Sequence, residues 1–128
     1  MGCEFLRNMK TPNSMQRHCL ALDLLNDTEL INAYKKYHQK VWPEIELSII
    51  DAGIKRLEIY LIENRLFMIL EADNSFSFES KNEMDASNSK VQEWERLMWK
   101  YQKALPTAKP GEKWMLMEKI YELNSNSI

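Results

Sequence analysis

Short, dense apolar runs predict four β-strands in this chain. Apolar runs of this length between polar boundaries are typical of strands rather than of independent helices, and the second run is also rich in β-branched and aromatic residues. They span Gln16–Leu25, Ile54–Ile62, Arg65–Ala72 and Trp114–Leu123, and each is bounded by polar or turn-forming residues. Only Glu63 and Asn64 separate the second run from the third. A two-residue joint between such runs predicts a β-hairpin.

The polar segment after the first strand predicts a pair of short helices. Asn26 or Asp27 can cap a helix that begins at Thr28, because their side-chain oxygens accept hydrogen bonds from N–H groups of the first turn. Pro43 suits the first position of a second helix, which we expect to end before Gly53.

A second helix pair is expected between the third and fourth strands. Asp73–Ser89 is polar, with Phe76, Phe78 and Met84 as possible anchors of a short helix. Val91–Ala104 has the stronger pattern, because its apolar residues recur at alternating three- and four-residue steps.

The predicted order is therefore strand, helix pair, strand, strand, helix pair, strand. This is the split βαβ arrangement of ferredoxin-like α+β domains, a four-stranded antiparallel sheet with helices on one face. Because all the predicted strands are strongly apolar, the sheet face without helices needs a cover. Two chains packed sheet to sheet would supply it, so we expect a homodimer in the form of a dimeric α/β barrel.

Length and charge limit the organisation and the partners. A chain of 128 residues fits one domain, which we expect at residues 16–123, after a loose leader at 1–15 and before a fraying tail at 124–128. A net charge of -2 gives no basic surface for nucleic acid or for an anionic membrane.

The sequence gives no sign of a membrane anchor or a disulfide framework. No stretch approaches the roughly 18 consecutive apolar residues of a membrane span, and the leader lacks the apolar region of a signal peptide. The two cysteines, Cys3 and Cys19, support neither a disulfide framework nor a thiolate metal site. We therefore expect a cytoplasmic protein.

The inventory of reactive side chains narrows the possible chemistry. Two histidines and two cysteines, without HxH or HExxH spacing, argue against a transition-metal site built by the protein. Gly2, Gly53 and Gly111 are the only glycines, so the glycine-rich loop that usually binds nucleotide phosphates is missing.

Acid/base chemistry among aromatic side chains remains possible. Tyr34 and His38 are one helical turn apart, so they lie on the same face of the first helix and can touch one cavity. A histidine, with a reference pKa of about 6.5, can donate or accept a proton at neutral pH. Flat apolar faces that suit the C–H surface of a sugar or a protein core are offered by Trp42, Trp94, Trp99 and Trp114.

These residues also have structural explanations. A histidine near a helix end is often a surface or capping residue, and on the residues alone this is the commoner role for His38. Tyr34, Trp42 and Trp94 fit ordinary core packing. Trp99 lies at the edge of its helical stripe and fits either role.

The general base stays open in the sequence. Tyr34, a strand carboxylate such as Glu58, or water would each serve. Because Glu58 lies inside an apolar strand, exposure at a sheet edge or pairing with Arg56 is the alternative explanation for it.

Several motifs together resemble one known family. Tyr34–Glu44 reads YKKYHQKVWPE, and it is followed by Gly53, Glu58–Leu61, Met84–Ala86, Trp99–Tyr101 and Met117–Glu118. In their order and spacing these motifs resemble the L-rhamnose mutarotase family, and within it the branch associated with L-fucose. The likeness covers about residues 16–123, and the YxxxHxxxWPE element is its specific part.

The resemblance implies a dimeric ferredoxin-like fold and a reaction that interconverts the α and β anomers of a 6-deoxy-hexose without cofactor or metal. The family's proposed acid is the histidine of this element, which is matched by His38. The tyrosine one turn earlier corresponds to Tyr34, a partner for a sugar hydroxyl or a second proton carrier. The family tryptophan before a lysine corresponds to Trp99, a platform for the sugar.

Two positions depart from rhamnose-specific members. Met98 stands where they have a tryptophan, and Leu57 where they have a tyrosine. Both positions are expected to contact the sugar, and Trp42 and Glu58 are further candidate contacts. L-rhamnose and L-fucose differ in configuration at C2 and C4, and losing a tyrosine hydroxyl and an aromatic wall can re-select between them. L-fucose is slightly favoured, because the motifs resemble the branch of the family associated with L-fucose.

Two other functions fit the same pattern. Cofactor-free monooxygenases also use dimeric ferredoxin-like domains, which is a likeness of fold alone. A sugar-binding module without catalysis would bind the sugar and leave its anomer exchange rate unchanged.

Overall fold

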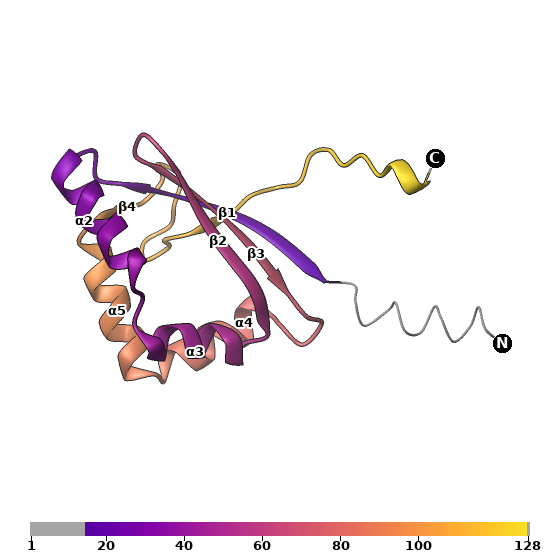
Figure 1. The fold of residues 1–128 in the computed structure, drawn as a ribbon, viewed down its shortest axis with the longest axis horizontal. Coiled ribbons are helices and arrows are strands. Elements are labelled where there is room, and N and C mark those ends of the chain that lie inside the picture. The colour runs from indigo at the N-terminus through magenta and orange to yellow at the C-terminus, as the bar shows by residue number, and fades with distance from the viewer. Residues whose placement is uncertain (1–14, 128) are drawn as a thin grey trace.

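The computed structural model describes residues 15–127. The predicted leader therefore lies outside the described residues except for Met15, and Ile128 lies outside them too. The elements, shown in Figure 1, are β1 Gln16–Leu24, α2 Thr28–Gln39, α3 Pro43–Asp51, β2 Ile54–Ile62, β3 Arg65–Ala72, α4 Phe78–Ala86, α5 Ser89–Trp99, β4 Gln102–Lys103, β5 Met115–Leu116 and the 3-10 helix η2 Ser125–Ser127. None of the helices in this range is long and apolar enough to span a membrane.

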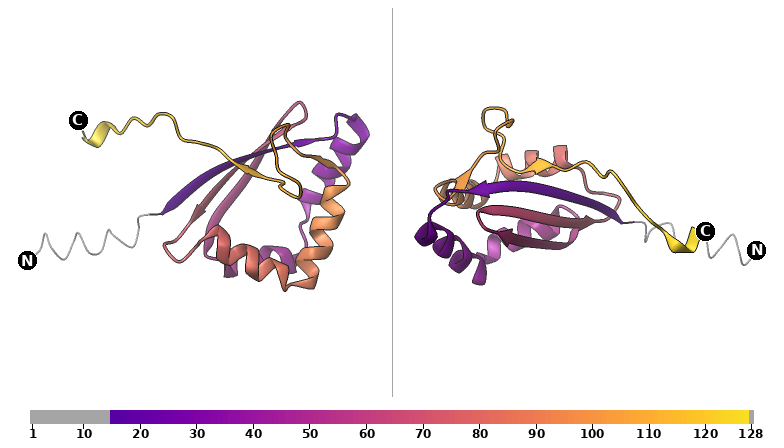
Figure 2. Two further views of the ribbon diagram at one scale, coloured as in Figure 1. Left: turned by 180° about the vertical axis from the view of Figure 1, so that it is seen from behind. Right: turned by 90° about the horizontal axis from the view of Figure 1, so that it is seen from above.

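One antiparallel sheet is the scaffold of the domain. Its strand order is β2-β3-β1-β4, and β5 also pairs with β1. The β2–β3 hairpin turns at Glu63 and Asn64 as predicted, with Glu63 in the left-handed region at a φ of 53°. The four α-helices gather on one face of the sheet (Figures 1 and 2). The prediction of an α+β ferredoxin-like fold is confirmed.

The C-terminal strand is shorter than the sequence predicted. In place of a strand over Trp114–Leu123, only Met115–Leu116 pairs with β1. The Met117 N–H still donates to the Cys19 carbonyl at 2.7 Å, and the chain then leaves the sheet as an extended arm (Figure 1). Along this arm Ile120 is 89% exposed, so within residues 15–127 this apolar side chain lies largely open to solvent.

The last predicted helix also ends early. The sequence predicted a helix to Ala104, but α5 ends at Trp99 and the chain turns into β4. Gln102 lies opposite Leu24 in the ladder with β1, and the Leu25 N–H donates to the Tyr101 carbonyl at 2.9 Å. The edge of β1 thus offers backbone hydrogen bonds that a helical spacing pattern does not reveal.

The core lies between the sheet and the helices, in two clusters. The first cluster draws on α2, α3, α5 and the sheet and consists of Leu24, Tyr34, Ile45, Leu66, Val91, Trp94 and Met98; the second consists of Leu20, Ile54, Leu70, Ala72 and Phe76. Burying one large apolar side chain stabilises a fold by roughly 1.5–3 kcal/mol. The first cluster holds α2 and α5 against the sheet, which fixes the positions of Tyr34 and Met98.

Two local features orient the helices that carry the site. The Asp27 carboxylate caps α2 as predicted, accepting a hydrogen bond from the Leu30 N–H at 3.0 Å. Gly53, at a φ of +98°, turns the chain from α3 into β2. A Cβ atom at Gly53 would lie 2.8 Å from the Asp73 carboxylate, so this position needs glycine both for its backbone and for its space.

Candidate active site

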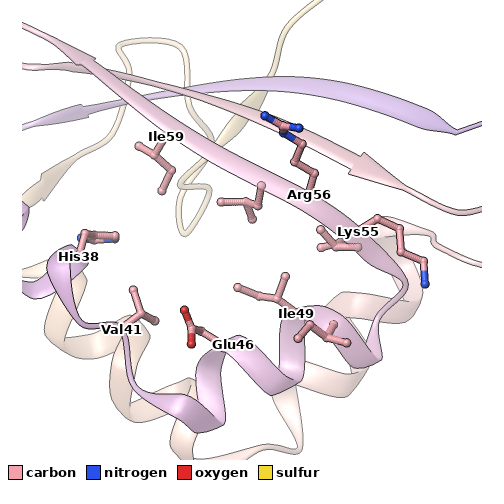
Figure 3. Close-up of a pocket in the computed structure, with 10 residues that line it drawn as sticks. His38, Val41, Glu46, Ile49, Lys55, Arg56 and Ile59 are labelled. Carbon is pink, nitrogen blue, oxygen red and sulfur yellow. The ribbon is translucent and has the colours of Figure 1, made fainter.

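A hollow lies between the sheet and the helices that cover it. It has two adjoining parts of about 530 Å³ and 580 Å³. Their walls share His38, Val41, Ile49, Leu57 and Ile59. Figure 3 shows the part next to α3 and β2, with His38 facing the space between the helices and the sheet.

His38 lies in the last turn of α2 with one ring nitrogen fixed. Its Nδ1 is 2.9 Å from the Tyr34 carbonyl oxygen. Because a carbonyl only accepts, Nδ1 carries the proton, and Nε2 of the neutral ring carries the lone pair. Burial lowers the pKa of His38, and the hydrogen bond to Tyr34 opposes this in part. The neutral ring is therefore the resting form at pH 7, with Nε2 ready to accept a proton.

Aromatic rings hold His38 in place. The Tyr34 ring is tilted against it at 4.4 Å between centroids, and the Trp94 ring meets it edge-on at 5.7 Å. Trp94 is itself buried and packs edge-on against Trp42 at 5.0 Å. The core role that the sequence favoured for Trp94 is confirmed. The Trp94 ring also packs against the ring of His38 and supports it.

The hydroxyl of Tyr34 is paired with a residue that the sequence did not single out. The Nε2 amide of Gln102 lies 3.2 Å from the Tyr34 Oη and donates to it. Burial raises the pKa of Tyr34 to about 12, while the hydrogen bond from Gln102 acts in the opposite direction. Tyr34 therefore keeps its proton at neutral pH, and its hydroxyl, which accepts from Gln102, retains a hydrogen that it can donate. The Oε1 atom of Gln102 is buried and lacks a hydrogen-bond partner among the described residues.

Leu57 and Met98 lie in the wall of the larger part of the hollow, together with Tyr34 and His38. They come from β2, α5 and α2, which are distant in the sequence. The structure thus brings together the two predicted proton-carrying residues and the two positions that depart from rhamnose-specific members.

The other predicted sugar contacts lie outside both walls. Trp99 ends α5 with 40% of its surface exposed, and the Lys113 ammonium lies over its ring at 5.0 Å. Trp42 precedes α3 and packs on Trp94. Glu58 pairs with Arg56 at 2.9 Å, and this hydrogen bond holds the pKa of the carboxylate below its usual range. Pairing, which was the alternative explanation for Glu58, is what the structure shows.

Several polar residues of the hollow were missed in the sequence. Glu46 of α3 lines the smaller part, and the larger part has Lys81, Asn82 and Asp85 of α4 in its wall (Figure 3 shows Glu46). Charged residues on a short polar helix look like solvent-facing residues in a sequence, so only the placement of α4 reveals them.

The loop before β5 adds one more charged group. The Lys113 Nζ donates to the Glu95 carbonyl at 3.1 Å, and both residues line the larger part of the hollow. Burial lowers the pKa of Lys113. Its hydrogen bond ties the loop to α5.

Within residues 15–127, no group of three or more His, Cys, Asp or Glu side chains is placed to hold a metal ion.

Comparison with known proteins identifies the family. The model of the L-rhamnose mutarotase family matches residues 17–123. The chain belongs to the L-rhamnose mutarotase family. Like the other mutarotases of that family, it is a carbohydrate isomerase.

Two named mutarotases show the range of similarity within the family. An L-fucose mutarotase of Xanthomonas campestris pv. campestris is 42% identical over 113 residues, which are 87% of this chain and 90% of that protein. An L-rhamnose mutarotase of Klebsiella pneumoniae is 32% identical over 79 residues, which are 60% of this chain and 68% of that protein.

Solved structures agree on the fold. The crystal structure of an L-rhamnose mutarotase from Formosa agariphila has a TM-score of 0.63 at 20% identity, and the match covers 85% of this chain and 99% of that one. The tetracenomycin F2 cyclase of Streptomyces glaucescens has a TM-score of 0.55 at 19% identity, covering 86% of this chain and 98% of that one. Mutarotases thus share this fold with a polyketide cyclase, so the fold alone does not fix the reaction.

Proposed function

We propose that this mutarotase interconverts the α and β anomers of a 6-deoxy-hexose, with L-fucose preferred to L-rhamnose. The observation that carries the proposal is the orientation of His38. Its Nδ1–H is bound to the Tyr34 carbonyl, while the ring lines both parts of the hollow. Ring opening of a sugar needs a base for the anomeric hydroxyl and an acid for the ring oxygen, and a neutral imidazole that lines a cavity can act as the base and then, once protonated, as the acid.

The proposed reaction moves one proton between two oxygens of the sugar. The Nε2 atom of His38 accepts the proton of the anomeric hydroxyl, the C1–O bond to the ring oxygen breaks, and a C1 carbonyl forms. The imidazolium then gives its proton to the former ring oxygen, and both oxygens are within reach because they share C1. After rotation about C1–C2 the reverse transfers close the ring on the other face. Such acid/base help is worth about 10²- to 10⁴-fold, which suffices for a reaction that proceeds slowly in water.

Tyr34 serves as a hydrogen-bond donor in this scheme. Its pKa of about 12 keeps the phenol protonated. Because Gln102 donates to the Tyr34 oxygen, the phenolic hydrogen is directed away from the amide. That hydrogen can bind an oxygen of the sugar while His38 carries the proton. In this proposal His38 is both the base that takes the proton from the anomeric hydroxyl and the acid that gives it to the ring oxygen.

Two observations support L-fucose as the preferred sugar. The L-fucose mutarotase relative is 42% identical over nearly the full length of both chains. Leu57 and Met98, the positions that depart from rhamnose-specific members, both line the hollow. An aliphatic wall at these positions leaves room where a tyrosine and a tryptophan would stand, which changes the hydroxyl configurations that fit.

We also propose that the enzyme is a homodimer formed by the outer faces of two sheets. On that face Cys19 and Ala21 of β1 lie opposite Ile69 and Phe67 of β3, and Tyr60 of β2 is 53% exposed. The exposed C-terminal arm adds further apolar surface, with Ile120, Tyr121 and Leu123 at 89%, 75% and 67% exposure. A second copy is the economical cover for such a surface.

Sedimentation tests the homodimer. We expect twice the 15.2 kDa of one chain for the wild type and dissociation for Ile69→Lys, which places a charge on the outer face. A wild-type protein that sediments only as a single chain at micromolar concentration would refute the dimer.

Saturation-transfer NMR tests the activity itself. With one anomeric proton of L-fucose saturated, the signal of the other anomer should fall faster when wild-type enzyme is added. L-rhamnose should show a smaller effect at the same enzyme concentration. Acceleration of neither sugar would contradict the proposed reaction, and a larger effect on L-rhamnose would contradict only the preference.

A further inference from the structure

Helix α4 presents polar side chains to the hollow where a core helix would present apolar ones. A helix on a sheet normally turns an apolar stripe inward. In α4 no residue is buried, and the residues that line the larger part of the hollow are Phe78 at its start and then the polar Lys81, Asn82 and Asp85. Lys81 and Asp85 are four residues apart, so they share one helical face. After Phe78, which packs against the core, the inward face of α4 therefore suits a polar ligand.

The Lys81–Asp85 ion pair is unusually well shielded. Its Nζ and Oδ2 atoms are 2.7 Å apart, and the two side chains are only 20% and 14% exposed. In every other ion pair within residues 15–127, the cationic side chain is more than half exposed. Charged hydrogen bonds gain strength when they are shielded from water. A pair in this setting is suited to binding a ligand and is more than a surface contact.

Hydrogen-bonding capacity remains on both members of the pair. The ion pair uses Oδ2 of Asp85, which leaves Oδ1 as an acceptor, and the ammonium of Lys81 has three N–H donors. The backbone is held as well, because the Gln92 side chain donates to the Asp85 carbonyl at 2.9 Å. Asn82, between them, adds an amide with both a donor and an acceptor.

The wall contributed by the sheet has the opposite character. It is made of Leu20, Leu57, Ile59, Met68 and Leu70. A 6-deoxy-hexose has a methyl group at one end and hydroxyl groups along its ring. Such a sugar fits this hollow with its apolar surface toward the sheet and its hydroxyls toward α4.

We propose that Lys81, Asn82 and Asp85 form a hydroxyl-binding wall that recognises the configuration of the sugar. The proposal rests on the proposed function, since it names the part of the same site that holds the hydroxyls remote from C1. Asp85 accepts from one or two of these hydroxyls, and Lys81 and Asn82 donate to their oxygens. Loss of these contacts weakens binding because the sugar hydroxyls then lose their charged partners.

Binding of a sugar that cannot react tests the proposal separately from catalysis. The probe is 1,5-anhydro-L-fucitol, which lacks the anomeric hydroxyl and cannot open its ring. By titration calorimetry we expect Asp85→Asn to weaken its binding about 10- to 100-fold, the usual effect of losing a hydrogen bond to a charged group. The matched control is Glu93→Gln, since Glu93 belongs to the Lys90–Glu93 helical ion pair, whose side chains are 51% and 54% exposed. This control should bind as the wild type does.

Analogues of the probe that lack one hydroxyl remote from C1 complete the test. If Asp85 binds a given hydroxyl, Asp85→Asn should cost much less affinity for the analogue without it, whereas a purely structural role would cost the same for every analogue. Lys81→Gln removes the other charge of the pair and is a second, independent variant, so the test still stands if Asp85→Asn fails to fold. Wild-type affinity in both variants, or no binding of the probe to wild type, would overturn the proposal. Weakened binding in a protein that fails to speed anomer exchange would leave it standing and refute the proposed reaction.

Discussion

The Nδ1 atom of His38 lies 2.9 Å from the carbonyl oxygen of Tyr34, one helical turn earlier. This one contact sets the tautomer of the imidazole and turns Nε2 into the acceptor. The YxxxH spacing brings the backbone carbonyl of Tyr34 within reach of this ring and places the Tyr34 side chain on the same helical face. The backbone of Tyr34 orients the histidine, and its side chain supplies a hydroxyl to the same hollow.

The lowered pKa of His38 predicts how stability depends on pH. The folded protein holds this group as the neutral ring, because burial disfavours its charge. The unfolded chain therefore binds the proton more readily, and stability should be fully present above the ordinary pKa of 6.5 and fall as pH drops below it. Urea titrations between pH 7.5 and 5 should show this loss, and His38→Gln should show a smaller one. An equal loss in both proteins would mean that other groups cause it.

The same pKa predicts the pH dependence of activity. The acceptor form of His38 is lost on protonation, so kcat/KM should decline only below 6.5, since burial lowers the pKa. Rates of anomer exchange measured across this range, with the uncatalysed rate subtracted, give the midpoint. A midpoint above 6.5 would contradict the burial of this ring as the dominant influence.

Tyr34→Phe should reduce both activity and stability. The buried amide of Gln102 would lose the acceptor it now has at 3.2 Å, which costs about 1–3 kcal/mol of unfolding free energy. Exchange should slow about tenfold, as expected for the loss of one hydrogen bond to the sugar.

A double variant separates the two effects. Tyr34→Phe with Gln102→Leu removes both polar partners, which is close to neutral for stability. It should therefore recover the unfolding free energy of the wild type without recovering the exchange rate. Recovery of both would assign Tyr34 a structural role alone.

Leu57→Tyr and Met98→Trp should shift the ratio of kcat/KM toward L-rhamnose. Both side chains line the hollow, and each change introduces the residue type that the resemblance implies for rhamnose-specific members. Met98 is only 3% exposed, so a tryptophan there should also cost about 1–3 kcal/mol by overpacking. Leu47→Tyr on the exposed side of α3 is the control, since Leu47 is 57% exposed and lies outside the hollow. An unchanged ratio in both cavity variants would remove these positions from sugar selection.

Gly53→Ala should destabilise the fold by about 1–3 kcal/mol, because alanine is strained at positive φ. Its Cβ would also meet the Asp73 carboxylate at 2.8 Å, next to the turn that starts β2. Thermal unfolding checks this, with Gly111→Ala as the comparison. Gly111 has a φ of +82° but open space around its Cβ position, so its variant should lose less stability.

Much of the fold could be predicted because periodicity and turn residues are local properties. Asp27 caps α2 and the Glu63-Asn64 turn joins β2 to β3, both as the sequence indicates. The ends of the sheet could not be predicted in this way. Whether Gln102 pairs with β1, and whether the residues after Met117 leave it, depends on the edge that β1 presents in the assembled fold.

The candidate site was predictable only in part, for a related reason. Tyr34 and His38 share a helical face, so their spacing alone places them together. Gln102 reaches Tyr34 across 68 positions of the sequence, and Asp85 faces the hollow only because α4 lies over it. Trp99 is the opposite case. Its motif suggested a platform for the sugar, but its side chain lies outside the hollow.

The most direct test of the account is the anomer exchange rate of L-fucose with wild type and with His38→Gln, measured by saturation-transfer NMR. Glutamine is close to histidine in size and cannot carry a proton at neutral pH. Binding of 1,5-anhydro-L-fucitol to the variant shows whether the hollow is intact. We predict a loss of at least about 100-fold in the catalysed exchange, with binding retained, because the proton carrier is gone. Exchange at the wild-type rate in His38→Gln would contradict the role assigned to His38.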